Sequence, residues 1–219
     1  SYFQQIPFCY ANLTIEKCRF TLTKQNTTRS FDLKTNFTPL FITANGEVSG
    51  QVVFAGYGIT APEYHYDDYK DIDVKGKIVL VLKSEPQKNN ENALFEGKKD
   101  TPYSDVNYKI RNAAQHGAIG FLLVSDPINH LAITAQGHLW NSLYMKGKAK
   151  PSYNVCEEEG KSIPAIQVNS EVVNTLFGSV EALKKIQETM DVEMRPSSFL
   201  IPDVSMELAV AIDKKTFPS

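Results

Sequence analysis

The chain has 219 residues, of which 42% are hydrophobic and 22% charged, and its formal net charge is −2 at pH 7. This composition is typical of a globular protein that buries its own core, and so weak a charge argues against binding to nucleic acid or to an anionic membrane surface. No stretch approaches the roughly 20 consecutive apolar residues of a membrane-spanning helix, so we expect no membrane span.

The three cysteines, Cys9, Cys18 and Cys156, are too few for a disulfide framework and show no Cys-x-x-Cys metal spacing. The eight residues between Cys9 and Cys18 suit two neighbouring strands of a hairpin, so a disulfide between them is one expectation and two buried free thiols are the other. Sequons for N-glycosylation occur at three positions in the first forty residues, Asn12, Asn26 and Asn36.

The first 45 residues predict a strand-rich arm that packs on the same domain as the rest of the chain, which we place at residues 46–219. In the arm, apolar and polar residues alternate, as in half-buried strands. Residues 48–54 and 77–82 predict two central strands. The second has an unbroken apolar run, which is typical of a strand covered on both faces.

A polar, proline-containing segment at residues 84–100 predicts a surface excursion. A helix follows, with Ser104 as its N-cap, apolar residues every three or four positions and Gly117 as its stop. Residues 118–124 then predict a buried strand directly after the helix, which is the arrangement of an α/β unit.

The last third of the chain predicts a short strand at residues 163–168 and two helices, the first capped by Ser170 and the second spanning residues 180–190. Residues 204–212 alternate between apolar and polar side chains, which indicates an antiparallel strand with one covered face.

The longest irregular segment, residues 127–162, is where we predict a partner-facing surface, because long loops in compact domains are commonly functional. We take His138, Trp140 and Tyr144 as candidate binding residues. Trp140 could anchor a peptide or a partner domain, since an indole combines a large contact area with a hydrogen-bond donor. The alternative is that Trp140 only pins the segment onto the core.

Three segments resemble, in the right order, the hallmarks of the protease-associated (PA) domain of secreted zinc aminopeptidases of the transferrin-receptor/aminopeptidase-like family. The first is VFAGYGITAPEY at residues 53–64, which continues into the predicted strand ending at residue 82. The second is YKIRNAAQHGAIGFLLVSDP at residues 108–127, and the third is SIPAI at residues 162–166. The resemblance spans residues 46–190.

The resemblance implies an α/β (α+β) fold, a β-sandwich or open barrel with flanking short helices. The hallmark residues Gly56, Gly58, Gly76, Gly117 and Pro164 have structural roles in this interpretation. Glycines permit the bends and close approaches in which a Cβ atom would clash, and they permit the left-handed stop between a helix and a strand.

The resemblance also implies that the chain is not an enzyme by itself. In the family, two zinc ions bound by a separate catalytic domain activate a water molecule. The motifs that bind zinc are expected after a strand such as residues 204–212, whereas this chain stops at Ser219. We therefore expect zinc only in an absent catalytic domain, and neither metal nor cofactor in this chain. The expected partners are the peptidase domain of the same protein and its peptide or protein substrates, in a secreted or cell-envelope (periplasmic or extracellular) setting.

Two alternatives remain open. A hydrolase with its own metal site would have to assemble that site from dispersed residues such as His65, Asp67, His130, His138 and Glu157. The triplet at residues 65–67 lies in a predicted surface turn, and short motifs of this kind often match by chance. The other alternative is a stand-alone sorting or receptor module, similar to the PA domains of vacuolar receptors.

Overall fold

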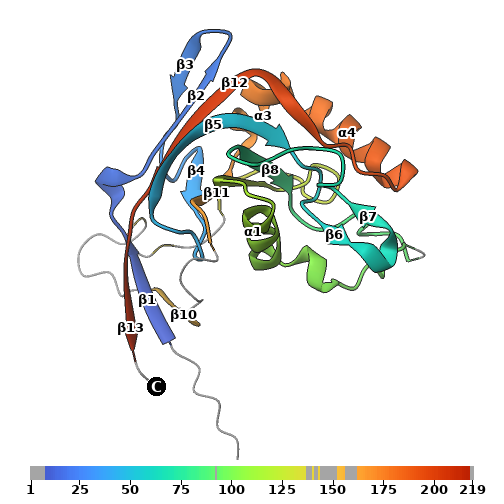
Figure 1. The fold of residues 1–219 in the computed structure, drawn as a ribbon, viewed down its shortest axis with the longest axis horizontal. Helices are drawn as coiled ribbons and strands as arrows, with labels where there is room; N and C mark the ends of the chain where they lie inside the picture. Colours follow the sequence, from blue (N-terminus) through green and yellow to red (C-terminus); the bar gives the residue numbers. More distant parts are fainter. Residues whose placement is uncertain are drawn as a thin grey trace, which may run out of the picture.

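The computed structural model describes residues 8–91, 93–136, 140, 143, 152–155 and 162–217. Figure 1 shows their arrangement, in which strands curve around a core and helices lie against it. The strands are β1 Phe8–Leu13, β2 Arg19–Lys24, β3 Thr27–Ser30, β4 Phe37–Pro39, β5 Gly46–Phe54, β6 Thr60–Ala61, β7 Tyr66–Asp67, β8 Ile78–Leu82, β9 Gly120–Val124, β10 Ser152–Val155, β11 Ala165–Val168, β12 Phe199–Val210 and β13 Ile212–Phe217. The α-helices are α1 Val106–Gln115, α3 Ser170–Phe177 and α4 Val180–Glu193.

Eight strands form one mixed sheet in the order β3-β2-β12-β5-β8-β9-β11-β4. Its four central strands, β5, β8, β9 and β11, are parallel to their neighbours within that group, whereas β12, β2, β3 and β4 pair antiparallel. The predicted central strands are thus confirmed as β5 and β8, and the predicted antiparallel strand as part of β12. Strands β2 and β3 of the predicted arm join one end of this sheet and β4 joins the other.

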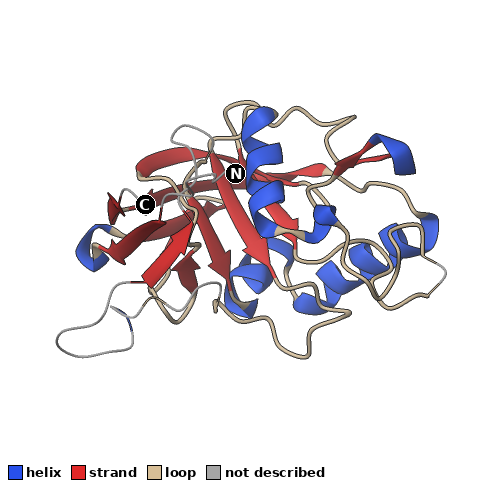
Figure 2. Ribbon diagram, turned by 90° about the horizontal axis from the view of Figure 1, so that it is seen from below, coloured by secondary structure: helices blue, strands red, loops and turns tan. Residues whose placement is uncertain are grey.

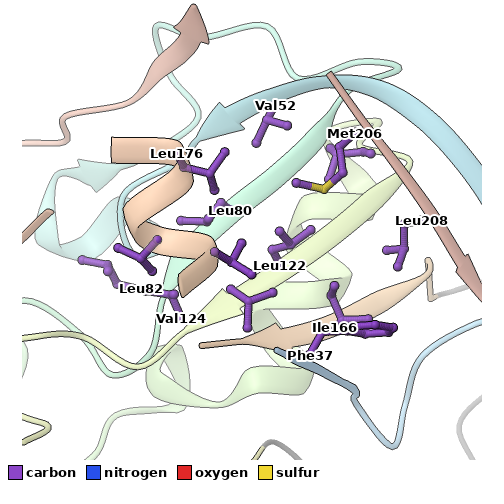
Figure 3. Packing of buried hydrophobic residues seen from close by; sticks show 14 of the residues in the cluster. Phe37, Val52, Leu80, Leu82, Leu122, Val124, Ile166, Leu176, Met206 and Leu208 are labelled. Atoms are coloured by element: carbon purple, nitrogen blue, oxygen red, sulfur yellow. The ribbon is translucent and has the colours of Figure 1, made fainter. Parts of the chain in front are cut away.

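Strands β8 and β9 are buried along their whole length and on both faces, which explains their unbroken apolar runs. Alternate residues belong to two different clusters. On one face, Leu80 and Leu122 pack with Leu176 of α3, as Figure 3 shows. On the other face, Val79 and Phe121 belong to a second cluster, which contains apolar residues of α1. The helices therefore cover the sheet from both sides, and in Figure 2 they lie around the strands.

The sheet curls into an open half-barrel (Figure 1), and chain length requires this. Strands β3 and β4 lie at opposite ends of the strand order, yet only residues 31–36 connect them. Seven residue steps span at most about 25 Å, whereas a flat eight-stranded sheet would hold its edges about 34 Å apart. Aromatic side chains fill the space between the two ends, where Phe20 stacks on Phe31 and meets Phe37 edge-on. The expected α+β fold with an open barrel and short flanking helices is confirmed.

A separate three-stranded sheet has the order β10-β1-β13. Strands β1 and β13 pair antiparallel along their whole length, from Phe8 opposite Phe217 to Leu13 opposite Ile212. The two ends of the described chain therefore run side by side, as Figure 1 shows. Strand β10, which lies inside the predicted partner-facing segment, pairs with the other edge of β1.

Two predicted helix caps are wrong by one residue. The N-cap of α1 is Asp105, whose carboxylate accepts the N–H groups of the second and third helical residues, and Ser104 belongs to the preceding turn. The N-cap of α3 is Asn169, and Ser170 is the first helical residue. In each pair two neighbouring side chains can both cap a helix, so composition alone does not choose between them.

Of the two expectations for Cys9 and Cys18, a disulfide or free thiols, the structure contradicts the disulfide. The hairpin on which it depended does not form, because β1 pairs with β10 and β13 whereas β2 pairs with β3 and β12. Cys18 is a free, buried thiol near the carbonyl oxygens of Thr14 and Ala211. Burial raises its pKa. None of the helices in the described part of the chain is long and apolar enough to cross a membrane.

Candidate functional site

The carboxyl ends of β5, β8 and β9 meet at one edge of the sheet, because these strands are parallel neighbours. In sheets with parallel strands, ligands bind outside this edge, where successive loops converge. Here the converging segments are residues 55–59, 83–91 and 125–130. We therefore take this carboxyl edge as the candidate functional site.

A buried carboxylate organises the bend after β5. Asp68 is 1% exposed, and its oxygens accept hydrogen bonds from the N–H groups of Tyr57 (3.1 Å) and Ile59 (3.0 Å) and from the Tyr66 hydroxyl (3.1 Å). Burial raises the pKa of Asp68 to about 7, against these hydrogen bonds. Gly56 has φ +50°, and a Cβ atom there would lie 2.1 Å from Asp68 Oδ1. The first hallmark glycine thus leaves room for the carboxylate.

A buried lysine joins this bend to the loop after β8. Lys109 of α1 is fully buried, and its Nζ donates hydrogen bonds to the carbonyl oxygens of Tyr57 (2.6 Å), Leu82 (3.0 Å) and Ser84. Burial lowers the pKa of Lys109 to about 7, and the nearby Asp68 opposes this shift. One ammonium group thereby links α1 to the ends of β5 and β8.

A second polar network links the same edge to α4. The Tyr57 hydroxyl donates to Asp191 Oδ1 (2.7 Å), and Gln187 Nε2 donates both to the Tyr57 hydroxyl and to Asp126 Oδ1, each at 3.0 Å. Burial raises the pKa of Tyr57 well above its usual value, so the phenol remains a donor at neutral pH. The end of α4 is therefore fixed to the loops after β5 and β9.

The start of the predicted partner-facing segment is held by Asp126, which is fully buried after β9. Its Oδ1 accepts the main-chain N–H (2.9 Å) and the side-chain amide (2.7 Å) of Asn129. Its Oδ2 makes no hydrogen bond of good geometry, although His130 Nδ1 lies 3.0 Å from it. The same nitrogen lies 3.2 Å from the main-chain carbonyl oxygen of Asp126. Asp126 and Asn129 thus form a tight turn that directs the segment out of the sheet.

A groove of about 400 Å³ opens between these loops. Two members of the networks, Asp191 and Asn129, also line it, so part of its wall is held by their hydrogen bonds. Its lining residues are Gln87, Lys88, Asn89, Asn90, Ile128, Asn129, Asp191 and Val192. None of them was predicted as a site residue. The burial of Lys109, which supports the edge, could have been predicted from the sequence. Lys109 lies three residues after Val106 and therefore falls on the apolar face of α1.

The prediction that Trp140 presents a contact surface is wrong, because its side chain is fully buried. The indole N–H donates to the Pro39 carbonyl oxygen at 2.6 Å, and the ring stacks on Phe41 with centroids 5.6 Å apart. Trp140 therefore pins its segment onto the β4 end of the sheet. The other two candidate binding residues, His138 and Tyr144, lie outside the described residues.

Of the residues proposed for a metal-dependent hydrolase, the three that the structure describes occupy two separate places. His65 and Asp67 line a depression beside β6 and β7, and Asp67 Oδ1 already accepts the Thr60 hydroxyl and the Tyr69 N–H. His130 instead contacts Asp126. Within the described ranges, no group of three His, Cys, Asp or Glu side chains could hold a metal ion, while His138 and Glu157 fall outside those ranges.

Comparison with known proteins gives a family and a fold. The PA domain family model matches residues 48–176, which is more than half of the chain. Comparison with curated proteins gave no match. Among solved structures, the fold is similar to "Aminopeptidase from Aneurinibacillus sp. strain AM-1", with a TM-score of 0.50, 16% identity, and coverage of 99% of this chain and 36% of that chain. A weaker similarity, with a TM-score of 0.39 and 13% identity, relates 96% of this chain to 35% of BSAP, a zinc aminopeptidase from Bacillus subtilis.

The chain thus spans about a third of the length of these two aminopeptidases. The family match covers the first two sequence hallmarks completely, and it includes the third at residues 162–166. This chain belongs to the PA domain family.

Proposed function

We propose that this PA domain is a non-catalytic accessory module of a secreted or cell-envelope zinc aminopeptidase. In this proposal it restricts the access of substrates to the attached catalytic domain and contacts peptides or proteins itself. Zinc belongs to the catalytic domain and not to this chain. The similarity in fold to an aminopeptidase of which the chain spans 36% supports the proposal.

The observation that carries the proposal is the three-stranded sheet β10-β1-β13. Because β1 and β13 are antiparallel neighbours, a domain connected through them would lie at one place, beside this sheet. Strand β10 adds the predicted partner-facing segment, residues 127–162, to the same sheet. Residues 152–155 of the segment thereby lie next to the connection, which supports a role of the segment in covering part of an attached domain.

The test uses the protein in which this chain is joined to its peptidase domain. Deleting residues 144–150 shortens the segment and keeps both Trp140 and β10. We expect kcat/KM for a small aminoacyl-anilide to change less than twofold, because a small substrate passes the segment freely. For a peptide of ten or more residues, we expect kcat/KM to rise at least threefold.

A matched control inserts Gly-Ser between Gln25 and Asn26, in the exposed turn between β2 and β3. This insertion should leave kcat/KM unchanged for both substrates. If the shortened segment changed neither rate, or lowered both equally, the access role would be refuted. A stand-alone receptor module would bind peptides in a pull-down and leave both rates unchanged.

A further inference from the structure

The groove at the carboxyl edge combines aliphatic side chains with an acid. Val192 is 82% exposed and Ile128 is 39% exposed, and both line the groove. Leu131, three residues after Ile128, is also fully exposed. At about 400 Å³ the groove is at the small end of the range of ligand sites, so it has room for one or two residues of a peptide.

The charge in the groove is negative. Asp191 is the acid in its wall, and no cation among the described residues pairs with it. The cation in the wall, Lys88, is already neutralised, because its ammonium group contacts the Asp100 carboxylate and the Lys98 carbonyl oxygen. A positive group entering the groove would therefore meet an uncompensated carboxylate.

The end of α4 adds to this negative potential. The last turn of this 14-residue helix contains Asp191 and Glu193 and no basic residue. The carbonyl end of a helix carries partial negative charge, so acids there are unfavourable and cations favourable. Burial also raises the pKa of Asp191, as expected of a carboxylate that lacks a counter-charge. The Tyr57 hydroxyl fixes its Oδ1, which leaves the carboxylate in one orientation.

We propose that this groove binds the free amino terminus of a peptide whose first residue is aliphatic. The α-ammonium group pairs with Asp191 at the end of α4, and the first side chain packs against Ile128 and Val192. The choice of an α-ammonium over a lysine side chain rests on the proposed function, since peptides that reach an aminopeptidase present a free amino terminus.

The binding test is a titration of the 219-residue chain followed by amide NMR shifts. The probe is Leu-Ala-Ala-amide, which we expect to shift the signals of Asn129, Asp191 and Val192. N-acetyl-Leu-Ala-Ala-amide lacks the charge and should bind at least tenfold more weakly. N-acetyl-Ala-Lys-Ala-amide carries a lysine ammonium group instead and should also bind at least tenfold more weakly. Equal affinity for either acetylated peptide would overturn the proposal.

Two substitutions on the same helix turn separate a specific site from general attraction. Asp191→Asn keeps the side-chain shape and can still accept from Tyr57, so we expect the fold to persist and the Kd for Leu-Ala-Ala-amide to rise at least tenfold. Glu193→Gln removes the same charge from a residue outside the groove, and we expect a change of less than twofold. Equal losses in both variants would show unspecific attraction and contradict the proposal.

Val192→Ser is a second test that does not depend on the hydrogen bonds of Asp191. The Val192 side chain is exposed, so its replacement should leave the fold unaffected. We expect the Kd for Leu-Ala-Ala-amide to rise at least threefold, because the first side chain of the peptide loses an apolar contact. An unchanged Kd would contradict the packing of the first side chain. If these titrations showed no binding, the effect of deleting residues 144–150 on kcat/KM would be unchanged. The binding proposal and the proposed access role can therefore be refuted independently.

Discussion

Replacing the buried lysine tests whether the carboxyl edge is held as described. Lys109→Met keeps the length of the side chain and removes the ammonium group, which leaves three carbonyl oxygens without their donor. Each hydrogen bond to a charged group contributes about 1.5–3 kcal/mol, and the buried charge itself opposes folding by several kcal/mol. The net loss in the free energy of unfolding should be about 3–5 kcal/mol, as for other buried charged groups that lose one partner.

The assay is urea unfolding followed by circular dichroism, with the m-value checked for constancy. Lys185→Met is the matched control, because Lys185 is an exposed helical lysine and its loss should change stability by less than about 0.5 kcal/mol. The double variant with Asp68→Asn should lose less than the sum of the two single losses, because the charges of Asp68 and Lys109 interact. A loss below about 1 kcal/mol for Lys109→Met would refute the reasoning.

Three further predictions concern stability. Gly56→Ala should lower the free energy of unfolding by more than about 3 kcal/mol, measured by urea unfolding, because the new Cβ would lie 2.1 Å from Asp68 Oδ1. Gly76→Ala should lower it by only about 1–2 kcal/mol, because Gly76 has φ +69° but open space around it. Equal losses in the two variants would contradict the steric argument. Trp140→Ala should lose about 3–5 kcal/mol, and a loss below 1 kcal/mol would show that Trp140 does not pin its segment. Because burial raises the pKa of Asp68 from 3.8 to about 7, the folded state keeps a proton that the unfolded chain releases between these pH values. The stability of the wild type should therefore fall, relative to that of Asp68→Asn, as the pH rises from 4 to 7. Parallel curves of stability against pH for the two proteins would contradict this prediction.

Local sequence signals predicted the centre of the fold. The apolar runs of β8 and β9 identify strands covered on both faces, and Gly117, with φ +86°, ends the helix before β9. The features that were missed depend on distant parts of the chain. Strand β10 forms because β1, more than 140 residues earlier, provides its partner. The turn at Ile15–Lys17 redirects the chain into a different sheet, which separates Cys9 from Cys18.

The candidate site was less predictable than the fold for the same reason. Its groove is assembled from the loops after β8 and β9 and the end of α4, and no single segment shows that they meet. The sequence does identify Trp140 as a large side chain in a long loop, but its direction is set by the carbonyl oxygen of Pro39, which lies 101 residues away. Asp191 has an ordinary place in a helical pattern, and only the packing of α4 brings it to Tyr57.

The most direct test of the central proposal, that this PA domain is a non-catalytic module, is an assay of the purified 219-residue chain. The chain is titrated with zinc, freed of excess metal and incubated with a panel of aminoacyl-p-nitroanilides, while bound zinc is measured by mass spectrometry. The account predicts less than 0.1 zinc per chain and no release of nitroaniline above the rate in buffer. One or two tightly bound zinc ions per chain, with turnover that a chelator abolishes, would contradict it.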